Sequence, residues 1–124
     1  MLSIYGMGHL PIPGALLITP TGAFAEVDVP ANRAHRLPFL YAALRCSTVD
    51  VVRLTRGIDM WIADEASNPL VVNHPASRLA IGFNHPRMIA GNALVTGVTN
   101  DGETRNLTER EFTRLLAKLE RLAG

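Results

Sequence analysis

The residues best suited to acid–base or metal chemistry lie where a strand-like run opens into a polar loop. Asp64 and Glu65 are adjacent carboxylates directly after an apolar segment. Carboxylates at such a strand end can bind a metal ion or act as general bases. His74 and His85 could join Asp64 around a metal, although the proline after each favours an extended turn. Solvated loop charges are the commoner outcome, so a ligand or metal site at Asp64, Glu65 and His74 is an alternative prediction.

Other signals of an enzyme are missing from the sequence. Cys46 is the only cysteine, which excludes an intrachain disulfide. It lies near apolar Leu44 at an expected helix end, where cysteine is commonly a small buried hydrophobe. There is no Gly-x-Ser-x-Gly elbow, and Gly6-Met7-Gly8 lacks the further glycine and preceding strand of a phosphate-binding loop. We therefore expect no catalytic residues and no cofactor, and the sequence favours a protein that is not an enzyme.

A row of cationic side chains follows the last helix expected from the sequence. Arg110, Arg114, Lys118 and Arg121 recur at spacings of four, four and three, which places them along one exposed face. Such a row could follow a phosphate backbone or contact a protein partner. Most charged helix faces are only solvated, and no aromatic side chain that could stack on a base is interleaved with this row.

Length, charge and hydropathy set the class of protein. A chain of 124 residues is one domain by ordinary size, and its formal net charge of +1 does not point to a polyanionic partner. All its cationic residues except Lys118 are arginine, which suits bidentate recognition but is also the bias of a GC-rich genome. The longest apolar run is far shorter than the roughly 20 residues of a membrane span. No signal peptide is recognisable, so we expect a cytoplasmic protein without a membrane partner.

Hydrophobic periodicity predicts the elements that must position these side chains. Five segments have the pattern of strands, and turns with glycine join the first four into two hairpins: 15–19, 24–29, 49–54, 58–63 and 92–98. An early helix should begin near Leu37, after the N-cap candidate Asn32, and end by Ser47. Two Asn-His-Pro triplets, at 73–75 and 84–86, are interpreted as turns around one or two helical turns.

The closing helix has the strongest local signals. Thr108 and Glu111 have the spacing of a capping box. An apolar stripe follows at helical spacing: Phe112, Leu115, Leu116, Leu119 and Leu122. Gly124 stands where a C-cap would fall. This pattern predicts an amphipathic helix that closes the domain.

These elements predict an α+β fold. A mostly antiparallel sheet of about five strands, with two main helices against one face, is the economical arrangement of this order. An irregular leader over residues 1–13 should precede a single domain over residues 14–124. The segment 60–62 is apolar on both faces, which is typical of a central strand. It could form a homodimer interface if its sheet edge were uncovered.

Several segments taken together resemble a known family. A strand ends in an acidic pair, an apolar step leads into Asn73, and small residues, a glycine-flanked strand and a terminal helix follow. The segments are Gly57 to Glu65, Leu70 to Asn73, Ala76 to Ala80 and Ile89 to Gly97. This pattern resembles the family called domain of unknown function 3846, over roughly residues 14 to 123. Ala66-Ser67-Asn68 departs from it, because a glycine usually follows the acidic pair.

The resemblance implies a biological context rather than an activity. Members of that family are small proteins of bacteria, phages and plasmids, so an accessory protein of a mobile element or an actinobacterium-like host is expected. If the family has a site, Asp64, Glu65 and Asn73 match its most polar motif and could converge at one end of the sheet. We expect a small non-enzymatic binding protein with a protein partner. Nucleic-acid binding through the cationic row is one alternative. A small-ligand or metal-dependent enzyme that uses Asp64, Glu65 and Asn73 is the other.

Overall fold

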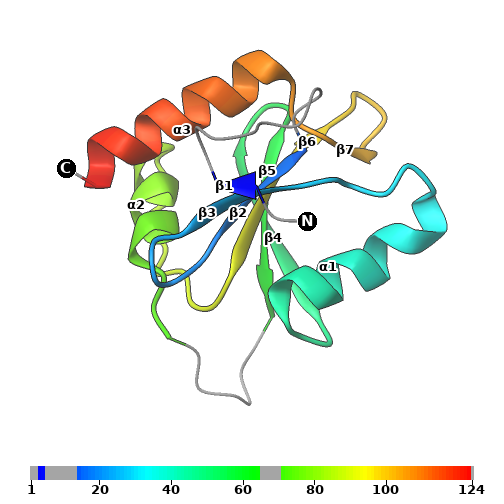
Figure 1. The fold of residues 1–124 in the computed structure, drawn as a ribbon, viewed down its shortest axis with the longest axis horizontal. Helices are drawn as coiled ribbons and strands as arrows, with labels where there is room; N and C mark the ends of the chain where they lie inside the picture. The colour runs from blue at the N-terminus through cyan, green and yellow to red at the C-terminus, as the bar shows by residue number, and fades with distance from the viewer. Residues whose placement is uncertain (1–2, 5–13, 65–70, 124) are drawn as a thin grey trace.

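One antiparallel sheet organises the chain, and helices pack on both of its faces (Figure 1). The computed structural model describes residues 3–4, 14–64 and 71–123. Along the sheet the strands lie in the order β1-β3-β2-β6-β5-β4, and β7 also pairs with β6. In chain order they are β1 Ser3–Ile4, β2 Ala15–Ile18, β3 Phe24–Val27, β4 Val49–Thr55, β5 Ile58–Ala63, β6 Ala93–Val98 and β7 Thr104–Arg105. The predicted α+β class and both predicted hairpins are confirmed.

Three α-helices accompany this sheet in the described part of the chain. They are α1 Arg36–Leu44, α2 His74–Gly82 and α3 Glu109–Ala123, and a short 3-10 turn, Arg33–His35, leads into α1. Asn32 caps that turn, because its side chain accepts the Ala34 N–H at 3.0 Å. None of these helices is long and apolar enough to cross a membrane.

The expectation that the helices share one face of the sheet is wrong. Helix α1 covers one face, whereas α2 and α3 lie together on the other (Figure 1). The reason lies in the central strands, since every residue of β2 and β6 is buried. Strands that are apolar on both sides need a cover on both sides.

The larger part of the core lies between the sheet and the α2–α3 layer. Met60 and Val95 of the sheet pack there against Leu79 of α2 and against Leu115 and Leu119 of α3, all nearly inaccessible to solvent. The predicted apolar stripe of α3 is thereby confirmed. A smaller cluster joins the opposite face to α1. The central strands are thus buried on both sides, and α3 is packed into the core from Phe112 to Leu119.

The first Asn-His-Pro triplet begins a helix, and its interpretation as a turn is wrong. Asn73 is the N-cap of α2, and its Oδ1 accepts the Ala76 N–H at 3.0 Å. Its amide group donates to the carbonyls of Ile18, at 3.0 Å, and Gly91, at 2.8 Å. Proline in the first turn, two residues after an asparagine, is a recognised helix start. The second triplet does form a turn, with Asn84 at a φ of 67°.

The exposed edge of the sheet at β4 is protected against further strand pairing. The Asp50 carboxylate accepts the Val51 N–H at 2.8 Å and also pairs with Arg87 at 2.8 Å. The His85 ring donates from Nε2 to the Leu54 carbonyl at 3.2 Å. Charged groups and covered backbone are common protections of edge strands. Strand β5 lies between β4 and β6, so the uncovered edge that a homodimer through residues 60–62 would need is not present.

Candidate functional site

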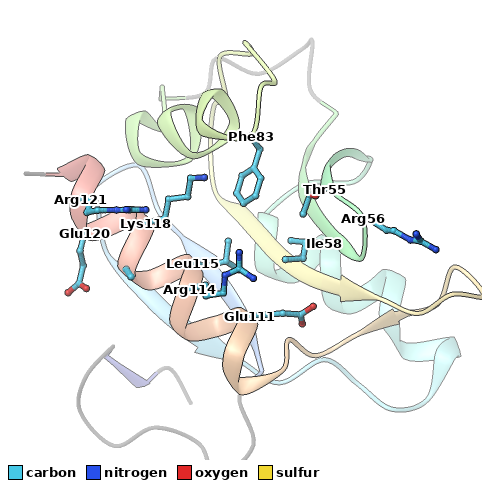
Figure 2. Close-up of a pocket in the computed structure, with 11 residues that line it drawn as sticks. Thr55, Arg56, Ile58, Phe83, Glu111, Arg114, Leu115, Lys118, Glu120 and Arg121 are labelled. Atoms are coloured by element: carbon cyan, nitrogen blue, oxygen red, sulfur yellow. The ribbon is translucent and has the colours of Figure 1, made fainter.

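A groove with a volume of about 810 Å³ runs between α3 and the tip of the β4–β5 hairpin. Figure 2 shows side chains of α3 on one side, hairpin residues on the other, and the Phe83 ring, from the end of α2, between them. Its lining consists of Thr55, Arg56, Ile58, Phe83, Glu111, Arg114, Leu115, Ala117, Lys118, Glu120 and Arg121. This size is within the range of sites that receive a small ligand or a few side chains of a partner.

The groove has an apolar floor. Ile58 and Leu115 are 9% and 2% exposed and belong to the main core, and the partly buried Phe83 packs against the same cluster. These side chains are fixed by the sheet and by the buried stripe of α3. An apolar group that enters the groove would therefore meet a preformed surface rather than one that must first be ordered.

The capping box positions the first turn of α3 at one end of the groove. Thr108 Oγ1 accepts the Glu111 N–H at 3.1 Å, and the Glu111 carboxylate accepts the Thr108 N–H at 2.9 Å. Each partner thus satisfies a donor that the helix itself leaves free. The predicted capping box is confirmed, and it fixes the rotation at which α3 presents its cationic residues.

Glu111 is an acidic residue of the groove whose charge is compensated from outside it. Arg105 donates from Nη1 and Nη2 to its two carboxylate oxygens, at 2.9 and 3.1 Å. This bidentate bond lowers the pKa of Glu111, helped by the hydrogen bond from Thr108 and opposed by burial. The same bond raises the pKa of the Arg105 guanidinium. Glu111 therefore stays ionised without making this end of the groove acidic.

Three arginines at the groove have no acidic partner within the described residues. Arg56, Arg114 and Arg121 are exposed, and none of them forms an ion pair with a residue of ranges 14–64 or 71–123. Their charges are therefore available to a bound molecule. A groove with an apolar floor and uncompensated guanidinium groups suits a ligand that is both apolar and anionic.

Lys118 joins α3 to the end of α2. Its Nζ lies 4.2 Å from the centroid of the Phe83 ring and donates to the Gly82 carbonyl at 3.2 Å. A Cβ atom at Gly82 would come within 2.9 Å of Lys118 Cε, so the absence of a side chain at Gly82 leaves room for the lysine stem. Lys118 thus contacts the Phe83 ring at the edge of the apolar floor.

The structure divides the cationic row predicted from the sequence. Arg114, Lys118 and Arg121 line the groove, whereas Arg110 lies beyond it, in a neighbouring depression that it shares with Arg114. Arg56 is a groove residue that the sequence pattern did not indicate. No local signal links it to α3, because only the packing of the hairpin against the helix brings them together.

The other predicted site residues that the structure describes lie apart from this groove. Asp64 is exposed, and its backbone pairs with Thr48 across the β4–β5 hairpin. His74 is also exposed, and Glu65 lies outside the described residues. Asn73 is fully buried and uses its side chain for the three hydrogen bonds given above. Within the ranges that the structure describes, no three His, Cys, Asp or Glu residues come together as metal ligands.

Two carboxyl groups in ion pairs have lowered pKa values, and these predict a loss of folding stability in acid. The pKa of Glu103 is lowered by its hydrogen bond with Arg33, and that of Glu111 by Arg105. A lowered pKa in the folded state stabilises the protein fully above the ordinary value of 4.5, and this contribution is lost as the pH falls through the folded value. We expect the free energy of unfolding in urea to fall steadily between about pH 5 and about pH 3.

The Glu111→Gln variant serves to test the origin of this pH dependence. It removes one of the carboxylates with a lowered pKa and keeps the shape of the side chain. Its free energy of unfolding should be lower at neutral pH and should depend less on pH in the acid range. An acid dependence as steep as that of the unchanged protein would contradict the assignment.

Comparison with known proteins identifies a family without a known activity. Residues 13–120 match the model of the family described as domain of unknown function (DUF3846), which confirms the resemblance over most of the chain. No curated protein and no solved structure gives a match.

Proposed function

The chain belongs to the DUF3846 family, and from that premise we propose that it is a non-enzymatic accessory binding protein that acts through protein–protein contact. Its setting would be the cytoplasm of an actinobacterial-type host, or a phage or plasmid of such a host. The groove beside α3 is the proposed contact surface. The observation that carries this proposal is the set of three arginines, Arg56, Arg114 and Arg121, without acidic partners in the described ranges, around an apolar floor.

The chemistry of the groove suits a protein partner. Arginine and aromatic side chains are enriched at protein interfaces, and binding energy concentrates where an apolar pocket receives an anchor residue. Here Phe83 and Leu115 supply the apolar surface, and the arginines supply charge that a partner's carboxylates can complement. A stable interface usually buries about 800 Å² on each partner, so the groove would be the anchor point of a larger contact.

Nucleic-acid binding by the cationic row is the second candidate. It is favoured by the continuity of four cations along α3, and it uses Arg110 as well as Arg114. The two functions therefore differ at Arg110, which the groove does not include, and at Arg56, which the row does not include.

Charge reversals at these positions test the proposal. The immobilised protein is exposed to a nuclease-treated lysate of the source organism, beside the variants Arg56→Glu, Arg114→Glu and Arg121→Glu, with Arg110→Glu as the matched control on the same helix. We expect a captured protein whose recovery falls about tenfold or more in each groove variant and is unchanged in the control. Circular dichroism of each variant shows that the fold is retained.

Two results would overturn the proposal. In the first, the captured proteins are recovered equally by the unchanged protein and all groove variants. In the second, the lysate without nuclease gives retention of nucleic acid that Arg110→Glu and Arg114→Glu both abolish, while Arg56→Glu has no effect. The second result would establish nucleic-acid binding instead.

A further inference from the structure

Within the proposed function, on which this step rests, we infer that the groove receives an acidic amphipathic α-helix of the partner. Such a helix would present carboxylates one turn apart to α3 and place an apolar side chain on the floor formed by Ile58, Phe83 and Leu115. Three observations support this occupant: the spacing of the cations on α3, the protected edge of the sheet at β4, and the positive net charge of the groove lining.

The spacing of the cations favours a helix. Arg114, Lys118 and Arg121 are four and three residues apart on α3, which corresponds to axial steps of about 6 and about 4.5 Å. A helix packed along α3 repeats the same steps on one face. An extended segment places side chains on one face about 6.7 Å apart, so its third carboxylate would lie roughly 3 Å beyond Arg121.

The sheet edge beside the groove does not favour an extended partner either. A bound strand would need free backbone groups at the edge of β4, which ends at the groove residue Thr55, next to Arg56. The Val51 N–H already bonds with the Asp50 carboxylate, and the Leu54 carbonyl already accepts from His85. A helix needs no such groups, because it satisfies its own backbone internally.

The groove lining contains four cationic residues and two carboxylates, Glu111 and Glu120, so its net charge is positive. Glu111 is occupied by its bidentate bond with Arg105, so it does not compete for the cations. Lys118 uses one of its three donors for the Gly82 carbonyl, which leaves donors for a carboxylate. The side of the groove formed by α3 is therefore complementary to an acidic helix.

Synthetic peptides test the inference. The first carries glutamates at i, i+4 and i+7 with leucines on the adjoining face; the second has the same composition with the glutamates distributed around the helix. The third alternates glutamate and leucine as a strand does, and an oligothymidylate represents nucleic acid. Fluorescence anisotropy should show that the first peptide binds about tenfold or more tightly than the others. Circular dichroism should show that it gains helicity on binding.

Variants of the protein locate the binding. Arg114→Glu should weaken the first peptide about tenfold, and Arg110→Glu should leave it unchanged. Equal affinity for the permuted or alternating peptide, or tighter binding of the oligothymidylate, would overturn the inference. If no peptide binds while lysate capture still depends on Arg114, the helical occupant is wrong and the proposed function stands. If that capture also ignores Arg114, the proposed function fails as well.

Discussion

Replacing Asn73 with alanine should lower the free energy of unfolding by about 3 to 5 kcal/mol. The change removes the N-cap of α2, since Oδ1 no longer accepts the Ala76 N–H. It also leaves the carbonyls of Ile18 and Gly91 without the amide donor that now reaches both. Because Asn73 is fully buried, water cannot replace these bonds without entering the core, and each orphaned group costs about 1 to 3 kcal/mol.

Urea denaturation followed by circular dichroism measures this loss. Asn73→Ser separates the loss of the helix cap from the loss of the two carbonyl bonds. Serine can still cap the helix, but it cannot reach both carbonyls. This variant should fall between alanine and the unchanged protein, and it remains informative if Asn73→Ala does not fold. Asn100→Ala, in the exposed turn after β6, is the matched control. A loss at Asn73 no larger than at Asn100 would show that the three hydrogen bonds contribute little.

The second large effect is expected at Gly97, where alanine should lower the free energy of unfolding by about 3 kcal/mol. A Cβ atom at this position would overlap the Arg105 guanidinium, which lies across β6 at that point. Arg105 would have to move, and it would then lose both bonds with Glu111 and its bond with the Asn106 carbonyl. The cost therefore comes from the displaced arginine rather than from the strand.

A double-mutant cycle checks this reasoning. In a protein that already carries Arg105→Ala, the change Gly97→Ala should cost less than about 1 kcal/mol, and it could be stabilising because alanine suits a strand interior better than glycine. Urea unfolding of the unchanged protein, the two single variants and the double variant gives the coupling free energy between Gly97 and Arg105. Two additive losses would mean that Gly97 and Arg105 act independently, contrary to the close approach in the structure.

The contacts among Gly97, Arg105 and Glu111 affect both the stability of the fold and the charge of the groove. Gly97 leaves space for Arg105, and Arg105 compensates Glu111, which both caps α3 and lines the groove. Loss of Arg105 would leave an uncompensated carboxylate beside Arg114. One set of contacts therefore closes the fold and keeps the candidate site cationic.

The elements specified by short-range interactions could be predicted from the sequence. Thr108 and Glu111 lie within one helical turn, so their reciprocal bonds need no information from elsewhere in the chain. Gly57, in the hairpin turn between β4 and β5, has a φ of 84°, a conformation that glycine adopts more easily than any other residue. The apolar stripe of α3 follows from helical periodicity, and the segments that carry the family pattern are also short runs of sequence.

Packing between distant segments determined the role of Asn73, the placement of the helices and the groove. Asn73 looked like part of a polar motif, and only the approach of Ile18 and Gly91 makes it a buried structural residue. The helices lie on both faces because β2 and β6 became central strands, which the sheet order establishes. The groove needs Arg56 and Phe83 beside α3. Periodicity shows which face of an element is buried, but only tertiary packing determines which face of another element it meets.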